Sequence, residues 1–97
     1  MLSNTINKFA TQQADLTLRL VPGIITLGRA KDNKIKISEE RVSKYHARIF
    51  TYFQASYIED LESTNGTFVN GKRIGTHILH PGDEVMLGKY RIQIETH

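Results

Sequence analysis

Residues 84–95 read EVMLGKYRIQIE, and their apolar pattern indicates two strands joined by a tight turn. Apolar side chains stand at odd positions before Gly88 and at even positions after Lys89, namely Val85 and Leu87, then Tyr90, Ile92 and Ile94. Successive side chains of a strand point to opposite faces, so a two-residue turn at Gly88-Lys89 brings all of these to one face. The segment therefore predicts a β-hairpin with one buried face.

Short segments of the same kind follow one another from Asp15 onward. The first alternates leucines with Thr17 and Arg19 until the turn at Pro22-Gly23, as expected of a half-buried strand over residues 16–20. Turn residues separate the later strands, which we predict at 25–27, 34–37, 45–53, 56–60, 67–69, 72–74, 77–79, 84–87 and 90–95. No helical pattern follows residue 14. The sequence thus predicts an all-β fold, an antiparallel β-sandwich or a small barrel.

The length and composition fit one globular domain, because 97 residues with 39% hydrophobic content allow a modest core. The chain has no cysteine, which excludes disulfides and thiolate metal sites. We expect residues 1–14 to form a tail or a short helix and residues 15–97 to form the folded domain. A basic start followed by an apolar run is missing, and no run approaches the ~18 apolar residues of a membrane span. We therefore expect a soluble, cytoplasmic protein without membrane contact.

The formal net charge of +3 hides a local cluster of basic residues. Three acidic residues stand between Arg29 and Lys44, against six basic ones, which are Arg29, Lys31, Lys34, Lys36, Arg41 and Lys44. Clustering, more than net charge, creates a field that attracts anions. The cluster permits a phosphate or nucleic acid partner.

Two Asn-Gly pairs lie close together in residues 63–71, STNGTFVNG. Asn-Gly favours a type I′ hairpin turn, because both central residues of that turn need φ > 0. Asn70-Gly71 fits this interpretation, since it lies between the predicted strands TFV and KRI. Asn65-Gly66 fits it poorly, because Ser63 and Thr64 precede it in place of an alternating apolar strand.

Three loops carry polar residues that strand packing does not explain: Gly28-Arg29, residues 38–46 and residues 62–67. They offer two arginines, a Ser-Lys pair and a Ser-Thr-Asn group. Arginine binds phosphate in a bidentate manner, lysine adds a point charge, and hydroxyls and backbone N–H groups complete the oxygen shell. The loops would suit a phosphate if they converge, which their spacing alone does not establish.

The same loops give the chain its resemblance to the forkhead-associated (FHA) domain. Four stretches are similar to that family in order and spacing, over roughly residues 16–94: LGRAKDNKIKI (27–37), RVSKYHARI (41–49), IEDLESTNGTFVNGKRI (58–74) and LHPGDEVMLGKYRIQI (79–94). The resemblance implies an antiparallel two-sheet β-sandwich with binding loops at one end. It also implies a non-catalytic module that binds phosphothreonine peptides in Ser/Thr kinase signalling and needs no cofactor.

The resemblance assigns roles to individual positions of this chain. Four of the expected phosphopeptide-binding residues contact the phosphate: Arg29 clamps it, Ser43 hydrogen-bonds it, Lys44 adds a second positive contact, and Thr64 lines its pocket. The other two contact the rest of the peptide: Asn65 binds the main chain of the ligand, and Arg41 lies opposite the third residue after the phosphothreonine. The expected architectural residues are Gly28, His46 and Gly66. In this scheme Asn65-Gly66 shapes a ligand loop, whereas Asn70-Gly71 turns a hairpin.

Three other interpretations are weaker. Ser43, His46 and Asp60 would form a hydrolytic triad, but no nucleophile elbow surrounds Ser43. A basic barrel that binds single-stranded nucleic acid would stack bases on exposed aromatic residues, here Tyr45, Phe50, Tyr52, Phe53 and Tyr57. We expect these aromatic residues on both faces of their strands and several of them in the core, which does not suit such a surface. His77 and His80 lack supporting ligands, so we expect no metal.

Overall fold

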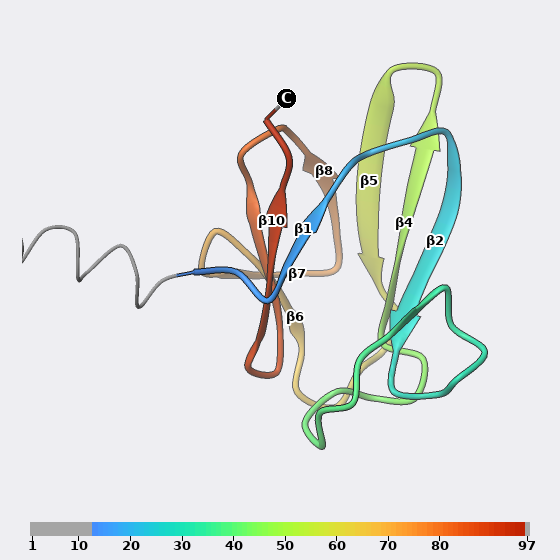
Figure 1. The fold of residues 1–97 in the computed structure, drawn as a ribbon, viewed down its shortest axis with the longest axis vertical. Helices are drawn as coiled ribbons and strands as arrows, with labels where there is room; N and C mark the ends of the chain where they lie inside the picture. Colours follow the sequence, from blue (N-terminus) through green and yellow to red (C-terminus); the bar gives the residue numbers. More distant parts are fainter. Residues whose placement is uncertain (1–12, 97) are drawn as a thin grey trace, which may run out of the picture.

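The computed structural model describes residues 13–96, which form ten β-strands and no helix (Figure 1). The strands are β1 (Leu16–Leu18), β2 (Gly23–Gly28), β3 (Ile35–Lys36), β4 (Ala47–Tyr52), β5 (Ala55–Asp60), β6 (Thr67–Val69), β7 (Lys72–Ile74), β8 (Thr76–Leu79), β9 (Glu84–Leu87) and β10 (Tyr90–Ile94). Each predicted strand is present, with ends that differ by at most two residues. The tail or helix predicted for residues 1–14 lies outside the described residues, apart from its last two positions.

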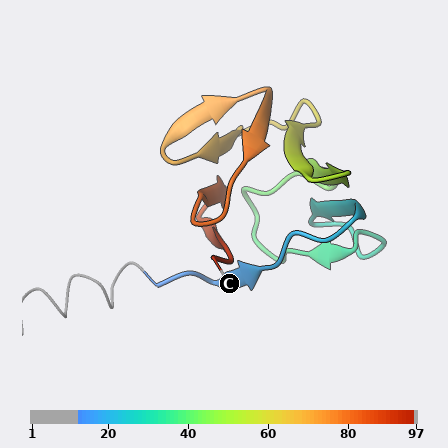
Figure 2. The ribbon, with the colours of Figure 1, turned by 90° about the horizontal axis from the view of Figure 1, so that it is seen from above.

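The strands form two five-stranded sheets, in the orders β1-β10-β9-β6-β7 and β3-β2-β4-β5-β8. Figure 2 shows the sheets as two facing layers, so the predicted two-sheet sandwich is confirmed. The sheets are mixed, however, because β1 pairs with β10 and β2 pairs with β3 in parallel. Hairpin turns force antiparallel neighbours, whereas these two pairs are joined by longer connections that leave the direction free.

Both predicted two-residue turns are confirmed. Leu87 and Tyr90 pair across Gly88, which has a φ of 60°. The turn between β6 and β7 has φ values of 51° at Asn70 and 84° at Gly71, as a type I′ turn requires. These turns explain why the sequence uses glycine at both places.

The core lies between the sheets and consists of the inward-facing residues of their strands, together with Ile37 and Val42 from the loop after β3. Within residues 13–96 it contains thirteen buried apolar side chains, among them Leu27, Ile49, Ile58, Leu87 and Ile92, each 1% exposed or less. Burying a side chain of this size contributes roughly 1.5–3 kcal/mol. This packing holds the strand ends that carry the loops.

The aromatic residues correct one sequence prediction. None of the five is in the core: Phe50 and Tyr57 are cross-strand partners that stack on the outer face of β4 and β5, with ring centroids 5.4 Å apart. Their neighbours Ile49 and Ile58 fill the core instead. Phe53 is 83% exposed in the β4–β5 turn. The assignment failed because the face of an aromatic residue depends on strand register, which composition does not determine.

The two ends of the sandwich differ. β2 ends, and β4 and β6 begin, at the lower end in Figure 1, where the loops between them gather. The β4–β5 turn lies at the other end. Within residues 13–96 no helix is long and apolar enough to cross a membrane.

Candidate functional site

The three polar loops converge at one end of the sandwich. The backbone N–H of Arg29 donates to the carbonyl of Ser43 at 2.9 Å, and the N–H of Thr64 donates to Oγ of Ser43 at 3.1 Å. The loop of residues 38–46 therefore lies between the other two and joins them. The structure thus supplies the convergence that the sequence spacing leaves open.

Arg29 is anchored by one edge of its guanidinium group. Its Nε donates to the carbonyl of Val42 at 2.9 Å, and the side chain is otherwise exposed. In the described part of the chain no carboxylate pairs with Arg29, Arg41 or Lys44. Both Nη groups of Arg29 thus stay available as a fork of donors.

A close backbone approach explains Gly28. A Cβ atom on this residue would lie 2.2 Å from the carbonyl oxygen of Lys44 and 2.8 Å from Nδ2 of Asn33. Asn33 is 8% exposed, and its Nδ2 donates to the carbonyls of Ala30 and Lys44, both at 2.8 Å. The sequence analysis missed Asn33, for which the only signal was an amide within a turn-forming run.

His46 braces the loops through both of its ring nitrogens. It is fully buried, and its Nδ1 accepts a hydrogen bond from the backbone N–H of Ser43 at 3.0 Å. Nε2 therefore carries the proton and donates to the carbonyl of Gly66 at 2.9 Å. One neutral imidazole thus ties the Ser43 loop to the Gly66 loop.

A second polar network, centred on Asp60 at the end of β5, holds the loop of residues 61–66. Oδ1 of Asp60 accepts from the hydroxyls of Ser63 at 2.5 Å and Thr67 at 2.7 Å, and its Oδ2 accepts from the N–H of Ser63 at 3.1 Å. Oγ of Ser63 in turn accepts from the N–H of Gly66. Burial raises the pKa of Asp60, but the hydrogen bonds from Ser63 and Thr67 outweigh it and hold the pKa below its ordinary value. Ser63 and Thr67 were also missed; an Asp three residues before a Ser at a strand end was the available signal.

The Asn65-Gly66 pair forms a loop and not a hairpin turn. Nδ2 of Asn65 donates to the carbonyl of Arg41 at 2.8 Å, which fixes the two loops to each other. Gly66 has a φ of 93°, and a Cβ there would lie 2.7 Å from Nε of Arg73. Thr64 and Asn65 are exposed, so their side chains lie on the surface next to Ser43.

The geometry does not support a hydrolytic triad. Both ring nitrogens of His46 bind backbone groups, and Oγ of Ser43 accepts from the N–H of Thr64. Asp60 binds Ser63 and Thr67 and no ring nitrogen of His46. Among residues 13–96 no three metal-binding side chains come together. The arrangement therefore suits holding an anion without attacking it.

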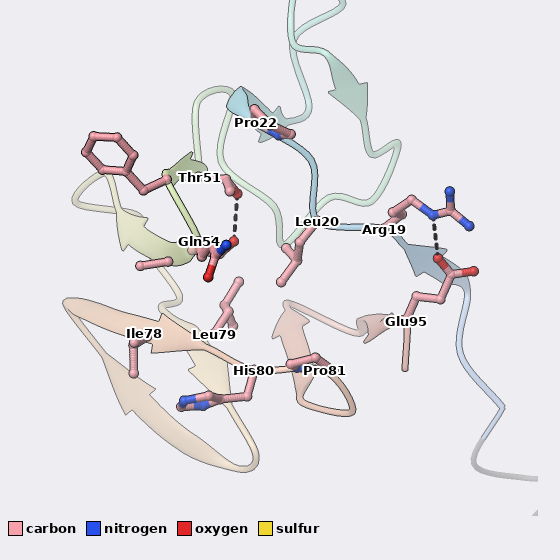
Figure 3. Close-up of a pocket in the computed structure, with 13 residues that line it drawn as sticks. Arg19, Leu20, Pro22, Thr51, Gln54, Ile78, Leu79, His80, Pro81 and Glu95 are labelled. Atoms are coloured by element: carbon pink, nitrogen blue, oxygen red, sulfur yellow. Dashed lines mark hydrogen bonds and ion pairs between the residues drawn. The ribbon is translucent and has the colours of Figure 1, made fainter. Parts of the chain in front are cut away.

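A hollow outside the loops lies at the opposite end of the sandwich, between the β1–β2 connection, the β4–β5 turn and the segment after β8 (Figure 3). Its volume is about 610 Å³, and its labelled walls include Leu20, Pro22, Ile78, Leu79 and Pro81. None of the loop residues at the other end lines it. Its walls are mostly apolar, which does not fit a phosphate.

Fold and loops together define a β-sandwich module with polar and basic loops joined at one end. The sequence model of the FHA domain matches residues 25–88 of the chain. The chain therefore belongs to the FHA domain family.

Curated relatives agree with this assignment. The chain is 45% identical over 73 residues to the ABC transporter ATP-binding/permease protein Rv1747 of Mycobacterium tuberculosis, over 75% of this chain and 8% of the transporter. It is 32% identical over 90 residues to the FHA domain-containing protein FhaB of the same organism, over 92% of this chain and 57% of FhaB. The chain thus spans a small part of the transporter and little more than half of FhaB.

Solved FHA structures have the same fold. One, from a study of phosphothreonine-dependent FHA domain interactions, has a TM-score of 0.76 and 33% identity, over 80% of this chain and 81% of that one. Another is the FhaA FHA domain in complex with the intracellular domain of Rv3910, with a TM-score of 0.71 and 32% identity, over 76% and 81% of the two chains. FHA domains are non-catalytic binding modules.

Proposed function

We propose that this chain binds phosphothreonine-containing proteins or peptides through the loops at the end of the sandwich and performs no catalysis of its own. The observation that carries the proposal is the position of Arg29: its Nε is held by the carbonyl of Val42, its backbone bonds the Ser43 loop, and that loop bonds Thr64. Membership of the FHA family and the solved structure from phosphothreonine-dependent interactions support it. We extend the domain to residues 15–97, because β1 and β10 pair outside the matched range.

The roles follow from the chemistry of the exposed groups. Arg29 clamps the phosphate, Ser43 and Thr64 hydrogen-bond it, and Lys44 adds positive charge. Asn65 binds the main chain of an extended ligand, and Arg41 faces the third residue after the phosphothreonine. A phosphoryl group brings a charge of roughly −1.5 to −2 and three acceptor oxygens, so these groups separate the modified partner from the unmodified one. We expect an affinity on the order of micromolar, about −8 kcal/mol.

The decisive experiment replaces Arg29 with lysine. Arg29→Lys keeps the charge but loses the bidentate fork, which should cost at least ~1.5–3 kcal/mol of binding, or roughly ten- to a hundredfold in affinity. Arg19→Lys is a matched control at the opposite end, because Nε of Arg19 also makes one hydrogen bond, to Glu95 at 2.8 Å. Both variants should lose about 1 kcal/mol of stability or less.

Fluorescence anisotropy with a phosphothreonine peptide and thermal melting by circular dichroism measure both effects on one preparation. Wild-type affinity in a folded Arg29→Lys protein would remove Arg29 from the site. Matched phosphothreonine and phosphoserine peptides give a second test by calorimetry. The threonine methyl group should contact the loops, so equal affinities would contradict the proposed mode of binding.

A further inference from the structure

A separate groove lies on one flank of the proposed phosphate site. Its volume is about 490 Å³, and its lining consists of Arg29, Ala30, Lys31, Asp32, Lys44 and Tyr45; we call it the Lys31 groove. Arg29 and Lys44 are shared with the phosphate site, but Thr64, Asn65 and Arg41 do not line the groove. It therefore extends away from the loops that are proposed to hold the ligand main chain and the residue after the phosphothreonine.

The backbone beneath the groove is fixed before any ligand arrives. The N–H of Ala30 donates to the carbonyl of Lys44 at 3.1 Å, and the buried amide of Asn33 bonds the same carbonyl and that of Ala30. Because Gly28 has no side chain, these two loops can lie in contact. A ligand in the groove thus meets a preformed surface and does not have to order it.

The charge of the groove is positive. Arg29, Lys31 and Lys44 give three cations against the single carboxylate of Asp32, a formal sum of +2. Among the described residues none of these cations pairs with a carboxylate. The hydroxyl of Tyr45 donates to Asp32, with both carboxylate oxygens at 3.0 Å, so the one anion already has a partner. The cations are left to attract a negative group from outside.

We propose that the Lys31 groove is a second anion subsite, which binds an acidic side chain or a second phosphoryl group on the residues that precede the phosphothreonine. The inference rests on the proposed function, because the direction of the peptide follows from the roles of Asn65 and Arg41. In that scheme the residues after the phosphothreonine lie against Asn65 and Arg41. The residues before it therefore pass over Arg29 toward Lys31. The domain would then favour ligands with two negative groups.

Matched peptides test this on the full chain. A parent peptide with one phosphothreonine and alanine at the three preceding positions is compared with versions that carry aspartate or phosphoserine at each of those positions. At the best position we expect aspartate to raise the affinity about two- to fivefold, the usual worth of an exposed ion pair, and phosphoserine to raise it further. The gain should shrink as salt is added, since these charges are exposed.

Two variants locate the effect. Lys31→Glu should abolish the gain while the parent peptide still binds, because Lys31 lies outside the phosphate site. Lys72→Glu, which makes the same charge change on an exposed residue of the other sheet, should keep the gain. A gain from phosphoserine alone would mean that the groove takes phosphate, and an equal gain from aspartate would mean that it takes any anion.

Failure of the inference is distinguishable from failure of the proposed function. If the parent peptide binds but no preceding position shows a gain, the subsite does not exist, while phosphothreonine binding stands. A gain that survives Lys31→Glu, or one that Lys72→Glu removes equally, would assign it to the general field of the protein and overturn the subsite. If neither the parent peptide nor any of its charged versions binds, the proposed function is wrong, and the subsite that rests on it is wrong too.

Discussion

Asp60 offers a direct test of how the binding loops are held. Its carboxylate receives three hydrogen bonds, from the hydroxyls of Ser63 and Thr67 and from the backbone N–H of Ser63. Asp60→Asn keeps the shape of the side chain but turns one acceptor into a donor. The amide then faces the N–H of Ser63, and two donors oppose each other.

The expected loss of stability follows from these three bonds. A hydrogen bond to a charged group contributes about 1.5–3 kcal/mol, and one between neutral groups about 0.5–1.5 kcal/mol. Asp60→Asn removes one charged bond and weakens two, so we expect it to lower the free energy of unfolding by about 3 kcal/mol. The network also fixes Gly66 through Ser63, so phosphopeptide affinity should fall with it.

The effect should depend on pH with a definite sign. The folded-state pKa of Asp60 lies below its ordinary value, which is about 3.9 in model peptides. The stability that Asp60 contributes is therefore fully present above that value and is lost as the pH falls through the lower, folded-state pKa. The difference between wild type and Asp60→Asn should be largest at neutral pH and shrink toward pH 3.

Urea denaturation of both proteins at pH 7 and at a series of acidic pH values measures this difference. Glu62→Gln is a matched control, since Glu62 is an exposed acid in the same loop with no hydrogen bond from its side chain in the described structure. It should change the unfolding free energy by less than about 0.5 kcal/mol. A difference for Asp60→Asn that stayed constant across pH, or that matched the control, would refute the network as the support of the loop.

Three more predictions concern other parts of the chain. Phe53 in the β4–β5 turn has a φ of 58°, which strains a residue with a side chain, whereas the β9–β10 turn has glycine (Gly88) at a φ of 60°. Phe53→Gly should therefore stabilise the domain by about 1 kcal/mol, and an unchanged urea midpoint would contradict this. Arg41→Glu should reverse the preference for an acidic or polar residue three positions after the phosphothreonine while binding remains phosphate-dependent, and a phosphopeptide library would show it. A synthetic peptide of residues 1–14 phosphorylated at Thr5 or Thr11 should bind the full chain. The chain's own phosphorylated tail would then occupy the site at an effective concentration up to about millimolar. Failure of both peptides to bind would refute this prediction.

The strands were predictable because their signals are local. Alternation and turn residues place all ten strands, and parity alone identifies the turn at Gly88-Lys89. The partners of β1 and β3 were not predictable in direction, because their pairings join segments with no tight turn between them. The stacked pair of Phe50 and Tyr57 was misplaced for the same reason, since only the register of β4 against β5 decides its face.

In the candidate site, the exposed residues were predictable from a sequence motif, whereas the buried residues that support them were not. The exposed candidates, such as Arg29 and Asn65, stand out through the family pattern. The residues that fix them in place do not: Asn33 and Ser63 are short polar side chains that look like ordinary turn formers. Their importance comes from burial and from hydrogen bonds to distant loops, which no local pattern encodes.

This division between exposed contacts and buried supports has a physical consequence for the domain. His46, Asn33 and the Asp60 network are satisfied by the protein's own groups, so the loops are ordered without a ligand. A phosphopeptide then binds without the entropic cost of ordering them, and its affinity depends on the exposed groups that touch it. Substitutions of exposed residues such as Arg29 should therefore change affinity far more than stability, whereas substitutions of the buried supports should lower both together.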